Sequence, residues 1–234
     1  MEINQTTGYP SIDKPWLKYY PKGADKIEPI NLTYYEYYVK ANSKYLNKPG
    51  IEYYKNVISR YDVIKNSDIA AKILNYLGVK KREQVLFGTI GIPEAFYIIM
   101  GLSKIGAGAN IVNITYEKDL LIDSILNSNY NVIFILDVFY DLFEETLKMP
   151  EMSNKKIVVI HFSESFPIFI RSISFKQRHD LKKKFNCLAK TYGLDISYYD
   201  DLIKKSNSMP DVEIAKYDKK LKFLTVYSSG TTSK

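Results

Sequence analysis

The sequence of 234 residues contains one cysteine, Cys187, and two histidines, His161 and His179. A single cysteine excludes an intrachain disulfide framework and is typical of a free thiol in a reducing compartment. Neither histidine has a cysteine or a second histidine nearby at a metal-ligand spacing, so we predict no metal site. We expect His161, which follows a strand-like run, to be structural, and His179, which lies among charged residues, to be exposed.

Long hydrophobic runs are also missing. No stretch approaches the roughly 18 apolar residues of a membrane-spanning helix. Residues 1–8 contain neither a basic region nor an apolar one, so the sequence predicts no signal peptide and a cytoplasmic protein. Glycine and proline are few, at 11 and 9 residues, which argues against a loop-dominated chain. The 46% of hydrophobic and 25% of charged residues are the balance of a globular protein.

The positive charge is concentrated in one segment. The chain has 33 Lys and Arg against 26 Asp and Glu, a net charge of +7, which favours anionic partners. Within residues 171–190, seven basic residues stand against Asp180 alone, and an apolar cluster over residues 162–175 precedes them. One interpretation is peripheral contact of residues 162–190 with the inner membrane face, since basic residues near anionic lipid contribute about 1 kcal/mol each. The other is a solvated surface whose aromatic residues join the core.

Short apolar runs alternate with amphipathic segments along most of the chain. A hairpin over residues 51–60 and a helix over 63–77 come first. The predicted strands that follow are residues 85–90, 109–112, 132–136, 157–160, 196–198 and 221–227. The predicted helices between them are residues 93–105, 117–128, 140–147 and 200–205. Continuous β-branched runs separated by amphipathic helices predict an α/β fold, a mainly parallel sheet with helices on both faces.

Residues 1–50 differ from the rest in being rich in aromatic residues and punctuated by proline. We interpret them as an N-terminal docking arm, because a disordered arm rarely carries so many aromatics. Residues 13–21 are predicted to be an extended segment that docks Trp16 and its neighbouring tyrosines. Residues 51–234 are predicted to form the domain.

The last strand leads into a segment suited to binding phosphate. Residues 228–232, Ser-Ser-Gly-Thr-Thr, offer four hydroxyl groups and one glycine that lets the backbone turn tightly. Successive N–H groups in such a turn form an anion-binding nest. The segment is not a Walker A loop, because the second glycine and the Gly-Lys-Ser/Thr ending are missing. The alternative from composition alone is a flexible tail.

The segment Val226–Thr232 resembles the opening of the phosphate loop of the adenylate-forming (AMP-binding) superfamily. Residues 102–107 followed by 110–113 are similar to an upstream motif of that superfamily, a helix end and Gly-Ala followed by a strand and turn. Residues 8–17 resemble the N-terminal arm of its bacterial acyl-CoA synthetases. Together these features cover nearly the whole chain and match the first part of the large N-terminal domain.

The resemblance implies an incomplete N-terminal domain that ends in the phosphate loop. The residues it assigns to ATP binding are Ser228, Ser229, Gly230, Thr231, Thr232 and Ser233. Ser233 stands where the family usually has glycine, and Ile114 stands where it often has proline. Lys234 occupies a variable position, and the loop's lysine would fall two residues beyond it. No catalytic residue of the family falls within the chain, so we expect the 234 residues alone to be inactive.

The implied enzyme is an ATP-dependent carboxylate–CoA ligase of the kind used in fatty acid metabolism. It would use ATP, Mg²⁺ and coenzyme A, forming an acyl-adenylate and then an acyl-CoA thioester from a small-molecule carboxylate. A carrier-protein adenylation domain of the same superfamily is the alternative within the family. Outside it, a non-catalytic basic module that binds membrane or nucleic acid is compatible with the net charge. The absence of a nucleic-acid motif and the concentration of charge in one segment argue against nucleic acid.

Overall fold

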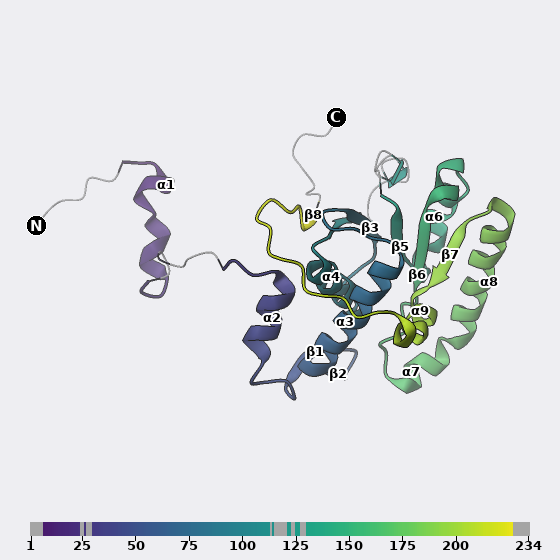
Figure 1. Ribbon diagram of the computed structural model, residues 1–234, viewed down its shortest axis with the longest axis horizontal. Coiled ribbons are helices and arrows are strands. Elements are labelled where there is room, and N and C mark those ends of the chain that lie inside the picture. The colour runs from purple at the N-terminus through teal and green to yellow at the C-terminus, as the bar shows by residue number, and fades with distance from the viewer. Residues whose placement is uncertain are drawn as a thin grey trace, which may run out of the picture. The chain divides into compact units, whose positions relative to one another are not determined.

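The computed structural model describes residues 7–23, 26, 30–112, 114, 121–122, 125–126 and 130–226. The chain divides into two compact units, Met1–Asn31 and Leu32–Lys234. Figure 1 shows the elements of both units, and each unit is described by itself.

The first unit contains a short helix, α1 (Pro10–Asp13), and a 3-10 helix, η1 (Pro15–Tyr19). Each begins with proline, whose fixed φ suits the first turn of a helix. The Asp13 carboxylate accepts hydrogen bonds from the backbone N–H groups of Thr7 and Gly8, at 2.8 and 2.9 Å. The extended conformation predicted across Pro15–Tyr19 is therefore wrong, because each proline starts a helical turn. Docking of residues 1–50 stays a prediction.

The second unit opens with helix α2 (Tyr34–Asn42), which lies within the segment predicted as an arm. A capping box starts it: Glu36 N donates to Thr33 Oγ1 at 3.1 Å, and Thr33 N donates to Glu36 Oε2 at 2.8 Å. The predicted hairpin and helix follow as β1 (Pro49–Tyr53), β2 (Asn56–Ser59) and α3 (Arg60–Tyr76). Both predictions are confirmed.

Six parallel strands form the main sheet, in the order β7-β6-β5-β3-β4-β8. They are β3 (Gln84–Gly88), β4 (Gly108–Ile111), β5 (Val132–Leu136), β6 (Lys156–Ile160), β7 (Asp195–Tyr198) and β8 (Leu224–Val226). The predicted parallel sheet is confirmed. The last strand is shorter than the predicted residues 221–227, since pairing with β4 begins only at Leu224.

Helices cover both faces of this sheet (Figure 1). Besides α3, the covering helices among the described residues include α4 (Pro93–Ile105), α6 (Tyr140–Leu147), α8 (Phe175–Tyr192) and α9 (Tyr199–Lys205). Helix α7 (Ile168–Ile173) precedes α8 and buries no residue. Short 3-10 helices are η3 (Asp137–Phe139), η4 (Pro150–Asn154) and η5 (Ser206–Ser208). Of the helix predicted over residues 117–128, the described residues 121–122 and 125–126 are helical.

The buried residues divide into two clusters, one on each face. Val85, Phe87 and Phe134 pack with α3, α4 and α9, whereas the alternate strand residues Leu86 and Ile133 pack with α6 and α8. Successive side chains of a strand point to opposite faces, so the sheet separates two cores. The predicted three-layer α/β arrangement is confirmed.

No helix in the described part of the chain is long and apolar enough to cross a membrane.

Candidate functional site at the carboxyl edge of the sheet

The carboxyl ends of all six parallel strands meet along one edge of the sheet. At the middle of this edge, β3 is followed by α4 on one face, and its neighbour β5 is followed by α6 on the other face. Open α/β sheets bind ligands outside the carboxyl ends of the strands, where connections turn to opposite faces. The buried residues Thr89 and Asp137 follow β3 and β5 at this point.

The predicted phosphate-loop residues, Ser228–Ser233, follow β8 in sequence and lie outside the described residues. The described strand β8 ends at Val226, which pairs with Ile111 in parallel register. This register places the carboxyl end of β8 at the same edge as the end of β4. The chain therefore enters the predicted loop from the edge at which such sheets bind ligands.

Strand β8 is held at its place by contacts with backbone and with one glutamine. Ala109 N donates to Phe223 O at 2.8 Å, just before β8 begins. Gln84 Nε2 donates to Lys222 O and to Thr225 Oγ1, both at 3.0 Å. A Cβ atom at Gly108 would overlap the carbonyl oxygens of Lys222 and Phe223, so only glycine lets the strand approach so closely.

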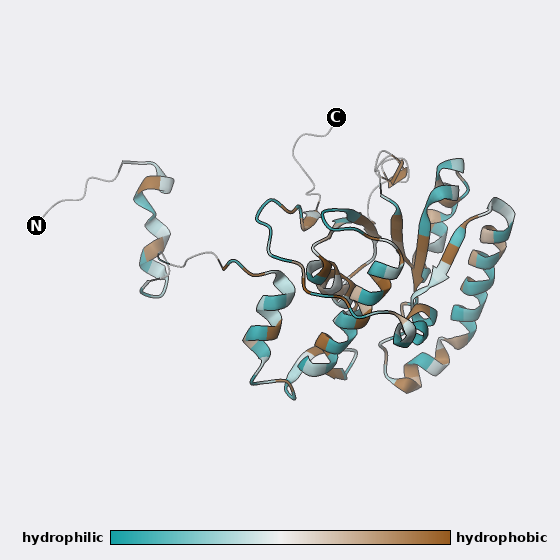
Figure 2. Cartoon of the chain, viewed as in Figure 1, coloured by the Kyte–Doolittle hydropathy of each residue, from teal (hydrophilic) through white to brown (hydrophobic). Residues whose placement is uncertain are grey.

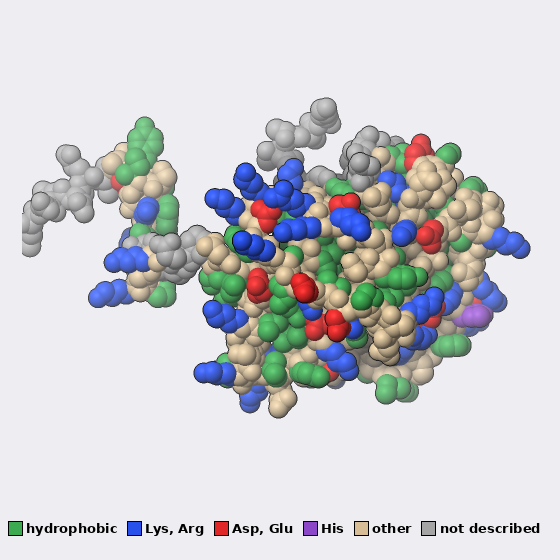
Figure 3. All heavy atoms as spheres, viewed as in Figure 1, with side chains coloured by type: hydrophobic (Ala, Val, Ile, Leu, Met, Phe, Trp, Pro, Cys, Tyr) green, Lys and Arg blue, Asp and Glu red, His purple; other side chains and the backbone are tan. Residues whose placement is uncertain are grey.

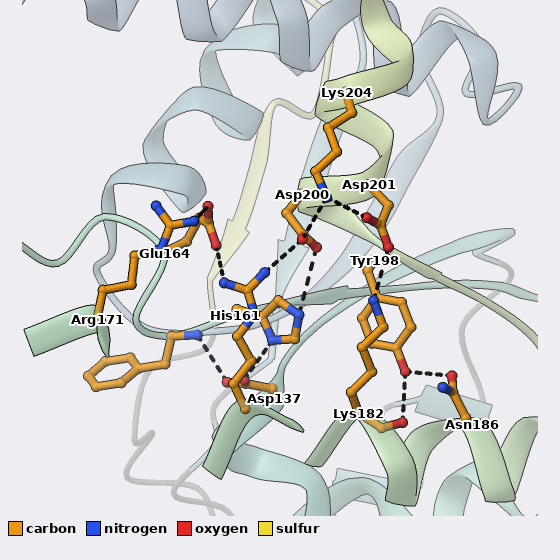
Figure 4. Close-up of polar contacts among 12 residues, drawn as sticks. Asp137, His161, Glu164, Arg171, Lys182, Asn186, Tyr198, Asp200, Asp201 and Lys204 are labelled. Atoms are coloured by element: carbon orange, nitrogen blue, oxygen red, sulfur yellow. Dashed lines mark hydrogen bonds and ion pairs between the residues drawn. The ribbon is translucent and has the colours of Figure 1, made fainter. Parts of the chain in front are cut away.

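A buried acid–histidine pair lies after β5 and β6 (Figure 4). Asp137 Oδ2 lies 2.9 Å from His161 Nδ1, and Asp137 Oδ1 accepts from Phe162 N at 3.0 Å. Asp137 and His161 are only 3% and 2% exposed. Because a carboxylate only accepts, the geometry assigns the hydrogen to Nδ1 of His161. The prediction that His161 is structural agrees with this burial, and His179 is exposed as predicted.

The other ring nitrogen of His161 faces a second carboxylate. His161 Nε2 lies 3.7 Å from Asp200 Oδ1, and neither atom has a hydrogen-bond partner within the described residues. The imidazole stacks on Tyr198, with ring centroids 5.6 Å apart and planes 8° from parallel.

Arg178 joins this group to the loop after β6. Its guanidinium bonds Glu164 Oε2 and Asp200 Oδ2, each at 2.7 Å, and Arg171 reaches Glu164 Oε1 at 2.9 Å. The Asp200 and Glu164 side chains are 10% and 19% exposed. Two cations thus neutralise two sheltered carboxylates and tie α7, α8 and α9 to the carboxyl edge of the sheet. Next to them, hydrogen bonding from Lys204 is the largest of the causes that lower the pKa of Asp201 to about 2.

Glu94, in the first turn of α4, is a separate buried acid. Its Oε1 accepts a short hydrogen bond from Ser165 Oγ, and its Oε2 has no hydrogen-bond partner among the described residues. Burial raises the pKa of Glu94 to about 7, because removal from water penalises the charged carboxylate more than the Ser165 hydrogen bond stabilises it. A carboxyl group with this pKa changes its charge near neutral pH.

Sequence reasoning did not identify Glu94, Asp137 or Asp200 as site residues. Asp137 and Asp200 carried a usable signal, since each follows a predicted strand directly or after one residue. Glu94 carried none, because a glutamate in the first helical turn is common and usually exposed. Within the described ranges, no group of three or more His, Cys, Asp or Glu residues is arranged to hold a metal ion.

Comparisons with known proteins match part of the length of adenylate-forming enzymes. No family model matches the chain. It is 23% identical over 194 residues to acetyl-coenzyme A synthetase 1 of Debaryomyces hansenii and 26% identical over 178 residues to that of Candida albicans. These alignments cover 80% and 76% of the chain but only 27% and 24% of the two relatives.

The solved structures show the same fold. An anthranilate CoA ligase bound to anthranoyl-AMP superposes with a TM-score of 0.64 at 20% identity, over 91% of this chain and 35% of that one. A long-chain-fatty-acid–CoA ligase from Archaeoglobus fulgidus superposes with a TM-score of 0.58 at 14% identity, over 88% of this chain and 36% of that one. The adenylation domain of a carboxylate reductase from Mycobacterium chelonae gives 0.64 at 11% identity, over 87% and 33%.

These matches confirm the predicted resemblance to the adenylate-forming superfamily. The fold matches part of an adenylate-forming domain, and the chain spans about a third or less of each relative.

Proposed function

We propose, starting from this shared fold, that the chain forms the front of an ATP-dependent carboxylate–CoA ligase. The observation that carries the proposal is the position of β8, whose carboxyl end lies at the edge where open parallel sheets bind ligands and which Ser228–Ser233 follow in the sequence. The curated relatives are acetyl-CoA synthetases, which favours coenzyme A over a carrier protein as acyl acceptor.

The proposed reaction has two steps. The substrate carboxylate attacks the α-phosphorus of ATP, which forms an acyl-adenylate and releases pyrophosphate. The thiolate of coenzyme A then attacks the acyl carbon and releases AMP. ATP brings Mg²⁺, which neutralises charge on the phosphate oxygens.

Ser228–Ser233 supply the donors suited to the pyrophosphate portion of ATP. The hydroxyl groups of Ser228, Ser229, Thr231 and Thr232 and the N–H groups around Gly230 donate to phosphate oxygens. Such donors accelerate the first step when they bind the transition state, in which negative charge develops on the leaving pyrophosphate, more strongly than they bind ATP in the ground state. We propose that the 234 residues supply this part of the site and are inactive alone.

Replacing Thr231 with valine in the complete ligase tests the assignment of the phosphate loop. Loss of one donor to the transition state is expected to slow ATP–pyrophosphate exchange by about a hundredfold. Thr146→Val is the matched control, since Thr146 Oγ1 is buried in α6 without a hydrogen-bond partner among the described residues. Exchange that is unchanged in Thr231→Val would remove the loop from the proposed mechanism.

We also propose peripheral contact with an anionic membrane through α7 and the start of α8. Four side chains here are strongly exposed: Ile168 at 87%, Phe169 at 75%, Ile173 at 68% and Phe175 at 71%. Figures 2 and 3 show α7 as a hydrophobic projection of the second unit. Exposed apolar groups of this size, next to basic residues, suit insertion at a lipid surface.

The seven basic residues within residues 171–190 fall into two groups in the structure. Arg171, Arg178, Lys182 and Lys184 form ion pairs with acidic residues outside the segment. Lys176, Lys183 and Lys190 form no ion pair with a described residue. The charge that remains for lipid headgroups is therefore smaller than the run in the sequence indicates.

Sedimentation with lipid vesicles tests this contact. The chain is expected to bind vesicles containing phosphatidylserine several-fold better than pure phosphatidylcholine, with binding reduced by salt. Phe169→Asp should abolish this binding, whereas Ile214→Asp, at another exposed apolar residue, should retain it. Vesicle binding that responds to neither salt nor anionic lipid would contradict the proposal.

A further inference from the structure

A cavity of about 370 Å³ lies between the β1–β2 hairpin, α3, α4, α9 and the loop after β6. Twelve described residues line it: Asn56, Val57, Ile58, Asp62, Asn66, Ile69, Glu94, Tyr97, Glu164, Ser165, Tyr199 and Ile203. Asn56 Nδ2 donates to Ser165 O at 2.9 Å, which joins the hairpin to the loop across the cavity wall. The volume is that of a site for a small molecule.

The lining is acidic, although the chain as a whole has a net charge of +7. Three of the twelve residues carry carboxyl groups, Asp62, Glu94 and Glu164, and none is Lys or Arg. Both oxygens of Glu164 bond arginines, and Asp62 Oδ2 accepts from Ser59 Oγ at 2.6 Å. Glu94 Oε2 is the remaining buried oxygen, without a hydrogen-bond partner within the described part of the chain.

A buried, unpartnered carboxylate oxygen in a cavity needs a donor or a positive charge. Arg171 and Arg178 neutralise Glu164, so Asp62 and Glu94 are the acids of the lining that would repel an anionic ligand, and no Lys or Arg lines the cavity to offset them. The side chains of Ile58, Ile69 and Ile203 add apolar surface for a short hydrocarbon chain.

We propose that this cavity binds a small alkylammonium ligand. Its ammonium group donates to Glu94 Oε2, and its methylene groups pack against Ile58, Ile69 and Ile203. No residue of the predicted phosphate loop is among the described residues that line the site, and the proposal does not depend on the proposed ligase activity.

The charge of Glu94 gives the site a defined pH dependence. With a pKa of about 7, Glu94 is mostly protonated at pH 6 and mostly ionised at pH 8. The other titratable groups that line the cavity are Glu164 and Asp62, which have partners, and Tyr97 and Tyr199, whose pKa values burial raises above their ordinary value. Of the charges near Glu94, that of Glu164 raises its pKa and that of Arg171 lowers it. Affinity for an ammonium ion is expected to rise about tenfold from pH 6 to pH 8.

Calorimetric titration of the 234-residue chain with n-pentylammonium tests the proposal, with 1-pentanol as the neutral ligand of the same length. Saturable binding of the amine at pH 8, with a dissociation constant below about 10 mM, is expected, and none of the alcohol. Glu94→Gln, which keeps an acceptor for Ser165 Oγ, should weaken amine binding at least tenfold. Glu52→Gln, an exposed carboxylate outside the cavity, should leave it unchanged.

Proton release from the unmodified chain gives a second measurement that needs no variant. At pH 7, titrations in two buffers of different ionisation enthalpy should show about half a proton released per amine bound, falling to none at pH 9. No saturable amine binding, equal binding of 1-pentanol, unchanged affinity in Glu94→Gln or no proton release at pH 7 would each overturn the proposal.

Discussion

Replacement of Arg178 by methionine is expected to lower the free energy of unfolding by about 3 kcal/mol, the low end for breaking a buried ion pair. Arg178 is the one described cation that bonds both Glu164 and Asp200 at 2.7 Å. Methionine retains much of the apolar length of the side chain, so the change removes charge more than volume. The variant leaves Asp200 sheltered, with Lys204 3.7 Å from its Oδ2.

Arg171 is the matched control for this prediction. It bonds the same carboxylate, Glu164, but its side chain is 45% exposed, against 19% for Arg178. Arg171→Met is therefore expected to cost about 1 kcal/mol or less, as exposed ion pairs do. Urea unfolding of both variants and the unmodified chain, followed by circular dichroism, measures the difference.

A double variant shows whether the stability lost in Arg178→Met comes from leaving the Asp200 carboxylate without its arginine partner. Asn at position 200 has no charge to leave unpaired and offers an amide that can donate to His161 Nε2. Arg178→Met combined with Asp200→Asn should therefore recover about half of the stability lost in Arg178→Met alone. Equal stability of Arg178→Met and Arg171→Met would show that burial does not strengthen this network.

Much of the fold was predictable because its strands are continuous and buried on both faces. Runs such as Val132–Leu136 and Lys156–Ile160 have few polar interruptions, and helices with proline starts or glycine ends separate them. The main errors concern short elements. Residues 15–19 form a 3-10 helix instead of an extended segment, and β8 begins three residues late because its pairing depends on a neighbouring strand.

The polar clusters were harder to predict, because their members are brought together only by the topology. Asp137, His161 and Asp200 follow three neighbouring parallel strands, β5, β6 and β7, and meet at the carboxyl ends of these strands. The basic run over residues 171–190 shows the same limit. Four of its cations form ion pairs with acids from other segments. The local sequence therefore did not reveal how much positive charge would remain for an anionic partner.

Gly108→Ala is expected to release β8 from the sheet and to lower the free energy of unfolding by about 3 kcal/mol. The new methyl group would lie 2.5 Å from Phe223 O and still closer to Lys222 O. Both are backbone atoms, so no side-chain rotation relieves the overlap. The segment that carries these carbonyls must move, and Ala109 N and Gln84 Nε2 lose the acceptors that they now bond.

Gly91→Ala is the matched control, because it adds the same methyl group to a glycine that lies outside the strands, between β3 and α4. A Cβ at Gly91 meets no atom within 4 Å, so this variant should be as stable as the unmodified chain. Hydrogen exchange followed by NMR locates the change, since the Ala109 amide should lose most of its protection in Gly108→Ala only. Retained protection of Ala109 would contradict the close packing of β4 against residues 222–223. Because Ser228–Ser233 follow β8 in the sequence, the same substitution in the complete protein should also slow pyrophosphate exchange if the proposed ligase activity holds, which links the packing of one glycine to the proposed chemistry.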